Sequence, residues 1–458
     1  MAIATTNPTT GQVEQSFTPH DEKEVDHRIS QVHNAFQQLK SSSFADRAGW
    51  MKATADALET DVDNAARLLT LEMGKTLKQA RAEVLKSANT MRFYADHAEE
   101  FLTGRALPDP SVVNASAAYT RYEPMGVVLA VMPWNYPIWQ VVRFAAPALM
   151  AGNTGLLKHA SNVPQAALYL DTLFDKGGFP EGSFRSLLIP AAGVERVARD
   201  HRVAAMTLTG SEPAGRSLAA IAGSEVKPVV LELGGSDPFI VTPSADIDGA
   251  VNTAVAARTS NNGQACINAK RFIVHQDVYS TFLERFTAAM AGLAVGDPMD
   301  DGTDVGPLAT ESGRRDIEEL VDDARDKGAT VATGGQTPDG QGWYYPPTVI
   351  ADITPEMKLY AEEAFGPVAS VYRVADREEA LALANATTFG LSSAVWTQDP
   401  GDEEFFVRGL EAGAVFVNGM SISYPQLPFG GVKDSGVGQE LSAEGIRAFC
   451  NLKSVWRG

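Results

Sequence analysis

Apolar residues recur every three or four positions through residues 21–104, which is typical of helices that bury one face. The clearest run is AARLLTLEMGKTLKQARAEVLKSANTMRFYADHAEEFL. From Gly126 the pattern changes. Short apolar segments such as GVVLAVM and TGLLKH alternate with helical segments such as PIWQVVRFAAPALMAG and PQAALYLDTLFDKGG. This alternation predicts an α/β fold in which crossover helices connect the strands of a parallel sheet.

A second α/β segment follows KPVVLELGG, with RFIVH and VASVYRVA as strands and VYSTFLERFTAAMAGL and RRDIEELVDDARDKG as helices. We place the join near Gly234 and Gly235, because paired glycines after a strand suit a hinge. Two pieces, ASAAYTRYEPM and the tail GIRAFCNLKSVWRG, fit neither sheet. Both are expected to be exposed strands, which usually pair with another strand.

A chain of 458 residues exceeds one compact core, so two or three domains are expected. The hydrophobic fraction of 44% and the charged fraction of 21% are those of an ordinary globular protein. The net charge of −19 disfavours nucleic acid and anionic membranes as partners. It also means that a small anionic substrate would need locally placed cations.

The chain has two cysteines, Cys266 and Cys450, too few for a disulfide framework, which favours a reducing compartment. The start, MAIATTNPTTGQVEQ, lacks the pattern of a signal peptide. The longest apolar runs fall short of the ~18 residues that span a bilayer. The seven histidines are scattered, with no metal-ligand spacing. These features predict a cytoplasmic protein without a metal.

Parallel sheets bind ligands beyond the carboxyl ends of their strands, and that rule selects four loops. These loops carry Asn135 in PWNYP, Lys158 and Ser161 in KHAS, Gly210 and Ser211 in TGSEPAGR, and Glu232 in LELGG. The third loop lacks GxGxxG, but a glycine turn before a helix can still present N–H groups to a phosphate. Ser211 either contacts that phosphate or only caps the helix.

Each of three residues, Glu232, Cys266 and Arg143, has one structural and one functional interpretation. Glu232 lies in an apolar strand end, so it is either a structural glutamate with a partner or a general base with a raised pKa. Cys266, in NNGQACINAKRF, is either a small buried hydrophobe or a catalytic thiolate. Arg143 is the only charge in PIWQVVRFAAPALM and lies four residues after Trp139. Its anionic partner is either an internal Asp or Glu, or a carboxylate on the substrate.

Taken together, these motifs resemble the aldehyde dehydrogenase superfamily over essentially the whole chain. PWNYP, LLKHAS, TLTGSEPAGR, LELGGSDPFIV, NNGQACINAKRF, EEAFGPV and PFGGVKDSGVG follow the family's order. The resemblance implies a Rossmann-like cofactor domain (residues 1–113 and 126–233) and an α/β catalytic domain (234–430). It also implies a small β oligomerisation arm (114–125 and 440–458) and a homodimer or homotetramer.

The resemblance also implies roles for individual residues. Cys266 is the expected nucleophile, Glu232 the general base, and Asn135, with the Cys266 N–H, the oxyanion site. The expected cofactor contacts are Trp134, Lys158, Ser161, Gly210, Ser211, Glu363 and Phe365. Many NAD-preferring members carry Glu three residues after the lysine. Ser161 stands there instead, which removes a charge that would repel a 2′-phosphate and favours NADP, although NAD use stays possible.

Within the superfamily, the chain is most similar to the NADP-preferring succinate-semialdehyde dehydrogenases. In that group, residues matching Arg143 and Ser423 hold the substrate carboxylate, and a residue matching Trp139 lines the tunnel. The alternative substrate is another aliphatic or aromatic aldehyde, for which Trp139 and Phe429 would form an apolar pocket. A thioester-forming enzyme that transfers its acyl group to coenzyme A is disfavoured, because such an enzyme is expected to lack the base at Glu232.

Overall fold

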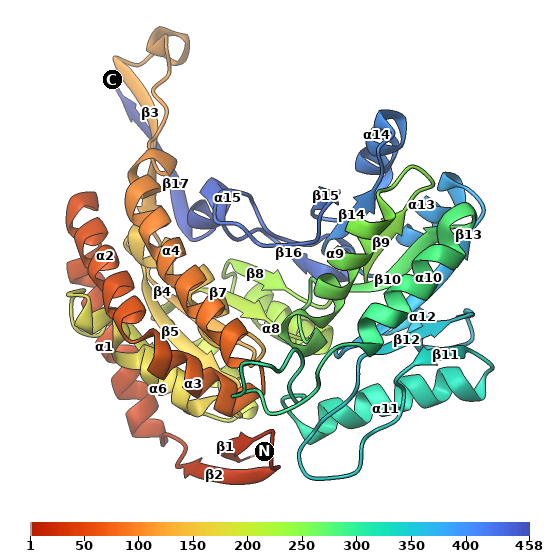
Figure 1. Ribbon diagram of the computed structural model, residues 1–458. Helices are drawn as coiled ribbons and strands as arrows, with labels where there is room; N and C mark the ends of the chain where they lie inside the picture. The colour runs from red at the N-terminus through yellow and green to blue at the C-terminus, as the bar shows by residue number, and fades with distance from the viewer. Residues whose placement is uncertain (1) are drawn as a thin grey trace.

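Two open sheets with helices around them form the body of the protein in the computed structural model, which describes residues 2–458 (Figure 1). The first sheet has the strand order β16-β8-β7-β4-β5-β6. Its strands are β4 (Val127–Met132), β5 (Thr154–His159), β6 (Phe184–Ser186), β7 (Val203–Thr209), β8 (Val229–Glu232) and β16 (Gly436–Val437). All but β16 run parallel, as the alternating pattern predicts, and FRSLLI forms only the short β6.

The helices linked to this first sheet fall into two groups. The crossover helices are α5 (Trp139–Ala151), α6 (Pro164–Lys176), α7 (Val194–Arg199) and α8 (Glu212–Ser224). The helices predicted within residues 21–104 are α1 (Glu22–Leu39), α2 (Phe44–Thr60), α3 (Val62–Met73) and α4 (Leu77–Phe101). Three of these eight helices matter most for the site, because α4, α5, α8 and the strand ends of β4 and β7 carry side chains that line it.

The second sheet has the order β11-β12-β13-β10-β9-β14-β15. Its strands are β9 (Asp237–Val241), β10 (Ala269–His275), β11 (Thr330–Thr333), β12 (Thr348–Ala351), β13 (Val368–Val374), β14 (Ser393–Trp396) and β15 (Val415–Val417). All pairs are parallel except β11 with β12. Its helices are α9 (Ile247–Thr259), α10 (Gln276–Ala291), α11 (Glu311–Asp326), α12 (Lys358–Ala361), α13 (Arg377–Asn385) and α14 (Pro400–Gly409).

The chain passes from the first sheet to the second between β8 and β9, through Gly234 and Gly235. Both glycines are sites of close packing. A Cβ on Gly235 would lie 2.8 Å from the carbonyl oxygen of Cys266, and a Cβ on Gly234 would lie 2.6 Å from Oε2 of Glu363. The glycine pair therefore lets this connection approach the cysteine loop, a role that a hinge interpretation does not include.

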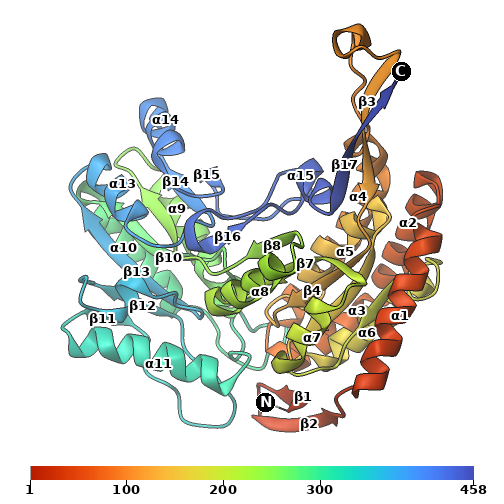
Figure 2. The same ribbon diagram turned by 180° about the vertical axis from the view of Figure 1, so that it is seen from behind.

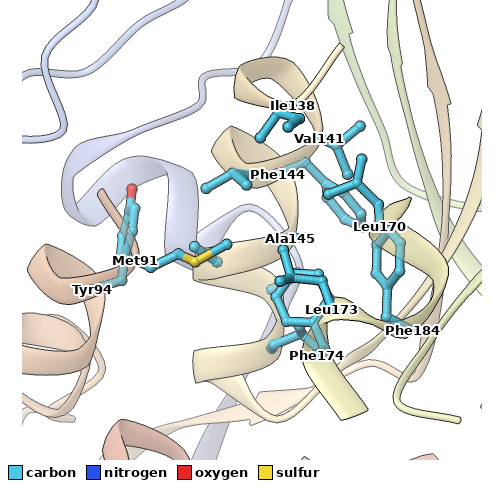
Figure 3. Packing of buried hydrophobic residues seen from close by; sticks show 14 of the residues in the cluster. Met91, Tyr94, Ile138, Val141, Phe144, Ala145, Leu170, Leu173, Phe174 and Phe184 are labelled. Carbon is cyan, nitrogen blue, oxygen red and sulfur yellow. The ribbon is translucent and has the colours of Figure 1, made fainter. Parts of the chain in front are cut away.

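The helix α5 is buried along its whole length, and Figure 3 shows how it is held. Met91 and Tyr94 of α4 pack on one side of it, and Leu170 and Phe174 of α6 pack on the other (Figure 3). A helix fixed on both sides gives its first two turns, with Trp139 and Arg143, a defined position. Dense packing of this kind allows little rearrangement of side chains.

The two segments that fitted neither sheet pair with each other. Strand β3 (Ala117–Pro124) runs antiparallel to β17 (Cys450–Arg457), and this ribbon projects from the body of the protein (Figure 1, Figure 2). The prediction that the whole tail from Gly445 is a strand is wrong at its start. Residues Ser442–Arg447 form helix α15, because Ile446 is buried in the core beside α4 and α5.

The hairpin of β1 (Ile3–Asn7) and β2 (Gln12–Phe17) was not anticipated. It is fixed by the buried carboxylate of Glu72, which accepts hydrogen bonds from Thr5 Oγ1 at 2.6 Å and from the backbone N–H of Gln165 at 2.9 Å. Burial raises the pKa of Glu72 to about 7. Within residues 2–458, no helix combines the length and the apolar character needed to cross a membrane.

Candidate active site

Cys266 lies where two cavities meet. The first, of about 240 Å³, is called the α4–α5 cavity and is lined by side chains that include Lys86, Trp139, Arg143, Ser423 and Phe429. The second, of about 280 Å³, is called the strand-end cavity and is lined by side chains that include Trp134, Asn135, Gly210, Ser211, Glu363 and Phe365. Cys266 lines both cavities, so its sulfur can face reactants that arrive from either side.

The loop that presents Cys266 has an unusual backbone. Asn261, Asn262 and Gly263 have φ values of 57°, 56° and 76°, all in the left-handed region. Asparagine and glycine tolerate this region best. The Asn262 side chain donates hydrogen bonds to the backbone carbonyls of Gly74 at 2.8 Å and Pro307 at 3.0 Å. The polar residues that precede Cys266 therefore stabilise the irregular conformation of its loop.

Arg258, at the end of α9, holds both ends of the same loop. It is fully buried and donates to the backbone carbonyl of Gly263 at 2.6 Å and to that of Ala269 at 2.9 Å. Burial lowers the pKa of Arg258 to about 9, with Glu363 and Asp237 acting in the opposite direction. The sequence does not point to Arg258, because a lone arginine near a helix end has no distinctive spacing.

The charge around Cys266 comes partly from Lys270, a residue that was not expected in the site. Burial raises the pKa of the Cys266 thiol to about 12, whereas Lys270 and then Arg143 lower it. The Lys270 ammonium donates to the backbone carbonyls of Ala265 and Cys266 and pairs with Glu363 at 3.0 Å. Its only signal in the sequence is a basic residue that follows the cysteine by four positions, near the start of an apolar strand.

Asn135, the predicted oxyanion residue, lies against the cysteine loop. Its Nδ2 donates to the backbone carbonyl of Gln264 at 2.9 Å, and the backbone carbonyl of Asn135 accepts a hydrogen bond from Asn261 Nδ2 at 2.8 Å. The second amide hydrogen of Asn135 is left for another acceptor. A buried amide fixed in this way is pre-organised, which is what stabilisation of a developing oxyanion needs.

Glu232 ends β8 and is 1% exposed. Neither of its carboxylate oxygens has a hydrogen-bond partner among the described residues. Burial raises the pKa of Glu232 well above the usual carboxyl range, Glu440 raises it further, and Arg143 acts in the opposite direction. The reading of Glu232 as a glutamate satisfied by a hydrogen-bond partner therefore loses support. A buried carboxyl with a raised pKa suits a group that exchanges protons.

Arg143 lines the α4–α5 cavity and has an internal acidic partner, one of the two possibilities that the sequence left open. Its guanidinium pairs with Glu440, and both side chains are almost fully buried. It also donates to Thr209 Oγ1 at 3.0 Å and lies 4.8 Å from the ring centroid of Phe429. Glu440 belongs to the segment predicted for the oligomerisation arm, and its position in the site was not anticipated.

Ser423 and Trp139, the other predicted substrate contacts, both touch the same lysine. Lys86 of α4 donates from Nζ to Ser423 Oγ at 2.8 Å, and its ammonium lies 4.1 Å from the ring centroid of Trp139. The three residues come from distant parts of the sequence and meet in the α4–α5 cavity. Lys86 was not selected by the sequence analysis, since it lies in an ordinary amphipathic helix.

The structure brings several of the predicted cofactor contacts together in the strand-end cavity. The rings of Trp134 and Phe365 meet edge to face, with centroids 5.7 Å apart. Ser211 occupies the N-cap position of the 13-residue helix α8, yet its side chain makes no capping hydrogen bond. Its hydroxyl therefore remains available to a ligand, and the purely capping interpretation is not supported. An aromatic pair beside a helix N-terminus suits a nucleotide with a flat ring and a pyrophosphate.

Lys158 and Ser161 lie at and just beyond the end of the neighbouring strand, β5. Lys158 is 7% exposed, and burial lowers its pKa. The backbone carbonyl of Ser161 accepts a hydrogen bond from the N–H of Ala4 at 3.1 Å, which ties this loop to the N-terminal hairpin. Glu363, another predicted cofactor contact, is paired with Lys270, so a ribose at this position would share the carboxylate with that lysine.

Comparison with known proteins identifies relatives of the chain over its full length. The model of the "Aldehyde dehydrogenase family" matches residues 1–455. A "Succinate-semialdehyde dehydrogenase [NADP(+)]" of Mycobacterium avium is 61% identical over 459 residues, covering 100% of this chain and 97% of that protein. A "Succinate-semialdehyde dehydrogenase [NADP(+)] 1" of Mycobacterium tuberculosis is 60% identical over 456 residues, with 100% of both chains covered.

Among solved structures, the succinic semialdehyde dehydrogenase of Streptococcus pyogenes in complex with NADP+ superposes with a TM-score of 0.96 at 35% identity, covering 99% of each chain. The family match, the relatives and the shared fold agree with the order of motifs in the sequence and with the cysteine between two cavities. The chain therefore belongs to the aldehyde dehydrogenase family.

Proposed function

We propose that the chain oxidises succinic semialdehyde to succinate, with NADP as its preferred hydride acceptor. This proposal rests mainly on the position of Cys266. The residue lies between the α4–α5 cavity, whose wall includes the cationic side chains of Lys86 and Arg143, and the strand-end cavity, which suits a nucleotide. The names of the relatives that are 60–61% identical over the full chain point to the same reaction. Oxidation of another aliphatic or aromatic aldehyde is the alternative, for which Trp139 and Phe429 provide apolar lining.

In the first half of the reaction, the Cys266 thiolate attacks the aldehyde carbon and forms a thiohemiacetal. The developing alkoxide accepts hydrogen bonds from the free amide hydrogen of Asn135 and from the backbone N–H of Cys266. Lys270 and Arg143 favour the thiolate, because both lower the thiol pKa. Trp134, Glu363 and Phe365 would hold the nicotinamide end of NADP, which would supply a hydride acceptor beside Cys266. Loss of hydride from the thiohemiacetal carbon leaves a thioester on Cys266.

In the second half, Glu232 takes a proton from the water that attacks the thioester carbon. The acid then leaves and the Cys266 thiolate is regenerated, so sulfur serves first as nucleophile and then as leaving group. The raised pKa of Glu232 makes it a stronger base than a surface carboxylate would be. Within residues 2–458, Glu232 is not among the side chains that line either cavity, so its carboxylate has to turn towards Cys266 during this step.

The residues proposed to hold NADP are those predicted from the sequence. Trp134, Phe365 and Glu363 are proposed to contact the nicotinamide end, and Ser211 with Gly210 is proposed to contact the pyrophosphate. Lys158 is proposed to contact the adenosine ribose, with Ser161 beside the 2′-phosphate. The helix N-terminus at Ser211, which has no side-chain cap, and the buried Lys158, which forms no ion pair within residues 2–458, support this fit to an anionic dinucleotide.

The domain division is part of the proposal. Residues 1–113 and 126–233 form the cofactor domain around the first sheet, and residues 234–430 form the catalytic domain around the second. Residues 114–125 and 440–458 are proposed to form an arm that joins subunits into a homodimer or homotetramer, with the β3–β17 ribbon as its projecting part and with Glu440 and α15 packed on the body. An isolated two-stranded ribbon is marginal in water, and the exposed Leu452 and Trp456 on β17 support its burial against another subunit.

A cytoplasmic location is also proposed, on the basis that both cysteines, Cys266 and Cys450, are free thiols. The thiolate mechanism needs a reduced Cys266.

The function is tested by measuring kcat/KM for succinic semialdehyde and for butyraldehyde, each with NADP and with NAD. The two aldehydes have the same number of carbons and differ in the carboxylate. A charge-assisted hydrogen bond contributes ~1.5–3 kcal/mol, so a preference of about tenfold or more for the semialdehyde is expected. Equal values for the two aldehydes would favour the alternative substrates. Cys266→Ala is the control and should abolish turnover while NADPH binding, followed by fluorescence, is retained.

A further inference from the structure

Three charged side chains line the α4–α5 cavity, namely Glu83, Lys86 and Arg143. Two of them are already neutralised inside the protein. Glu83 pairs with the buried Lys75, and its other oxygen accepts hydrogen bonds from the backbone N–H groups of Ile138 and Trp139, both at 2.9 Å. Arg143 pairs with Glu440. Among residues 2–458, no carboxylate forms an ion pair with Lys86, so Lys86 is the charge in this cavity that lacks a counter-ion.

Lys86 is also held in one position, which a solvated surface lysine is not. Its Nζ donates to Ser423 Oγ at 2.8 Å and lies over the ring of Trp139 at 4.1 Å. Ser423 is 4% exposed and Trp139 is 3% exposed, so both supports are fixed by packing. An ammonium has three N–H donors, and the serine uses one of them. Two donors remain for an anion in the cavity.

The surroundings of Arg143 make it the weaker candidate for that anion. Glu440 is paired with it, and Glu232 is close enough for Arg143 to lower its pKa. A substrate carboxylate beside Arg143 would bring a third negative group to one guanidinium. Burial, followed by the positive charge of Arg143, lowers the pKa of Lys86 to about 8, and the nearby carboxylate that acts in the opposite direction, Glu83, is already paired with Lys75.

We propose that Lys86, held in place by Ser423 and Trp139, is the charged anchor that binds the carboxylate of the aldehyde substrate. This inference rests on the proposed oxidation of a carboxylate-bearing aldehyde and identifies its specificity-determining cation. Arg143 then contacts the substrate only as part of the cavity wall. Its positive charge pairs with Glu440 and lowers the pKa of Glu232. The side chain of Glu83, one helical turn before Lys86, fixes the first turn of α5 and thereby the position of Trp139.

The test compares Lys86→Met with the wild-type enzyme, using the ratio of kcat/KM for succinic semialdehyde to that for butyraldehyde with NADP. Loss of one partner of a desolvated charge pair is expected to lower this ratio by about 30-fold or more. Lys86→Arg should keep most of the preference, and Ser423→Ala should lower it less than Lys86→Met. The matched control is Lys78→Met, a change of an exposed lysine on the same helix, which should leave the ratio unchanged.

Inhibition by succinate provides a second readout, because the anchor should also bind the product. Its inhibition constant should rise in Lys86→Met, and in the wild-type enzyme inhibition should weaken as the pH rises through about 8. If the wild-type enzyme shows no preference for the semialdehyde, the proposed function fails. If the wild-type preference exists and Lys86→Met retains it, or if both aldehydes lose equally, the anchor is not Lys86 and this inference is overturned.

Discussion

Arg143→Leu is expected to destabilise the protein and to slow the oxidation of every aldehyde, with or without a carboxylate. The guanidinium is 2% exposed and its partner Glu440 is 3% exposed, so the substitution leaves a buried, uncompensated carboxylate. Removing one partner of a buried ion pair costs ~3–5 kcal/mol. Catalysis should fall for both substrate classes, because Arg143 also acts on the pKa of the base Glu232 and of the Cys266 thiol.

The loss of stability in Arg143→Leu should depend on pH. Burial raises the pKa of Glu440 and Arg143 lowers it, so loss of the arginine raises this pKa further. Above the ordinary carboxyl range and below the raised pKa, the folded variant holds a proton that the unfolded chain releases. The free energy of unfolding of the variant therefore falls as the pH rises through this window. The deficit relative to the wild-type protein should be larger at pH 8 than at pH 6.

The assay is urea denaturation followed by circular dichroism at both pH values, together with kcat/KM for succinic semialdehyde and butyraldehyde. Glu440→Gln in the Arg143→Leu background is the matched control and should recover part of the lost stability, because it removes the uncompensated charge. Wild-type stability combined with a selective loss of activity on the semialdehyde would refute the reasoning. That result would make Arg143 the substrate anchor, the role implied by the family resemblance.

Three further outcomes are expected. Glu232→Gln should release one equivalent of NADPH in a burst and then stall at the thioester, as measured by stopped-flow absorbance, and the absence of a burst would show that Glu232 acts before hydride transfer. Ser161→Glu should lower the ratio of kcat/KM for NADP to that for NAD by about tenfold or more, since like charges brought together cost several kcal/mol; an unchanged ratio would place Ser161 away from the 2′-phosphate. Lys270→Met should shift the pH profile of inactivation by iodoacetamide upwards, because Lys270 lowers the pKa of the Cys266 thiol; an unshifted profile would contradict this electrostatic role.

The regular elements of the two sheets could be predicted because their signals are local. An apolar strand such as Val127–Met132, or a helix with apolar residues at every third or fourth position, carries its pattern within a few turns. The N-terminal hairpin and α15 lacked such a pattern. Both depend on partners far away in the chain, as with Thr5 and Glu72, or Ile446 and the core around α5. Tertiary contacts determine the conformation of these two segments, and the local sequence pattern does not reveal such contacts.

The candidate site divides in the same way. Asn135, Ser211 and Glu232 could be selected because topology places the carboxyl ends of parallel strands along one edge. Their roles, and those of Cys266, came from motifs and stay predictions until variants are assayed. Lys86 forms a hydrogen bond with Ser423, which lies 337 positions later in the sequence. Arg143 forms an ion pair with Glu440, which is also far away in the sequence. A single sequence does not show such pairings, so it could not decide which cation is free.

The difference between Arg143, which is paired, and Lys86, which is free to bind an anion, follows from the cost of burying charge. A charge taken out of water has to be paired, hydrogen-bonded or neutralised by a proton. The guanidinium of Arg143 pairs with Glu440 and also acts on the pKa of Glu232, which it does not contact through a hydrogen bond, and burial raises the pKa of both carboxyls. One cation between two acids holds a base ready for proton transfer but has little attraction left for a third acid. The carboxylate of the substrate therefore needs its own cation, and in the α4–α5 cavity that cation is Lys86.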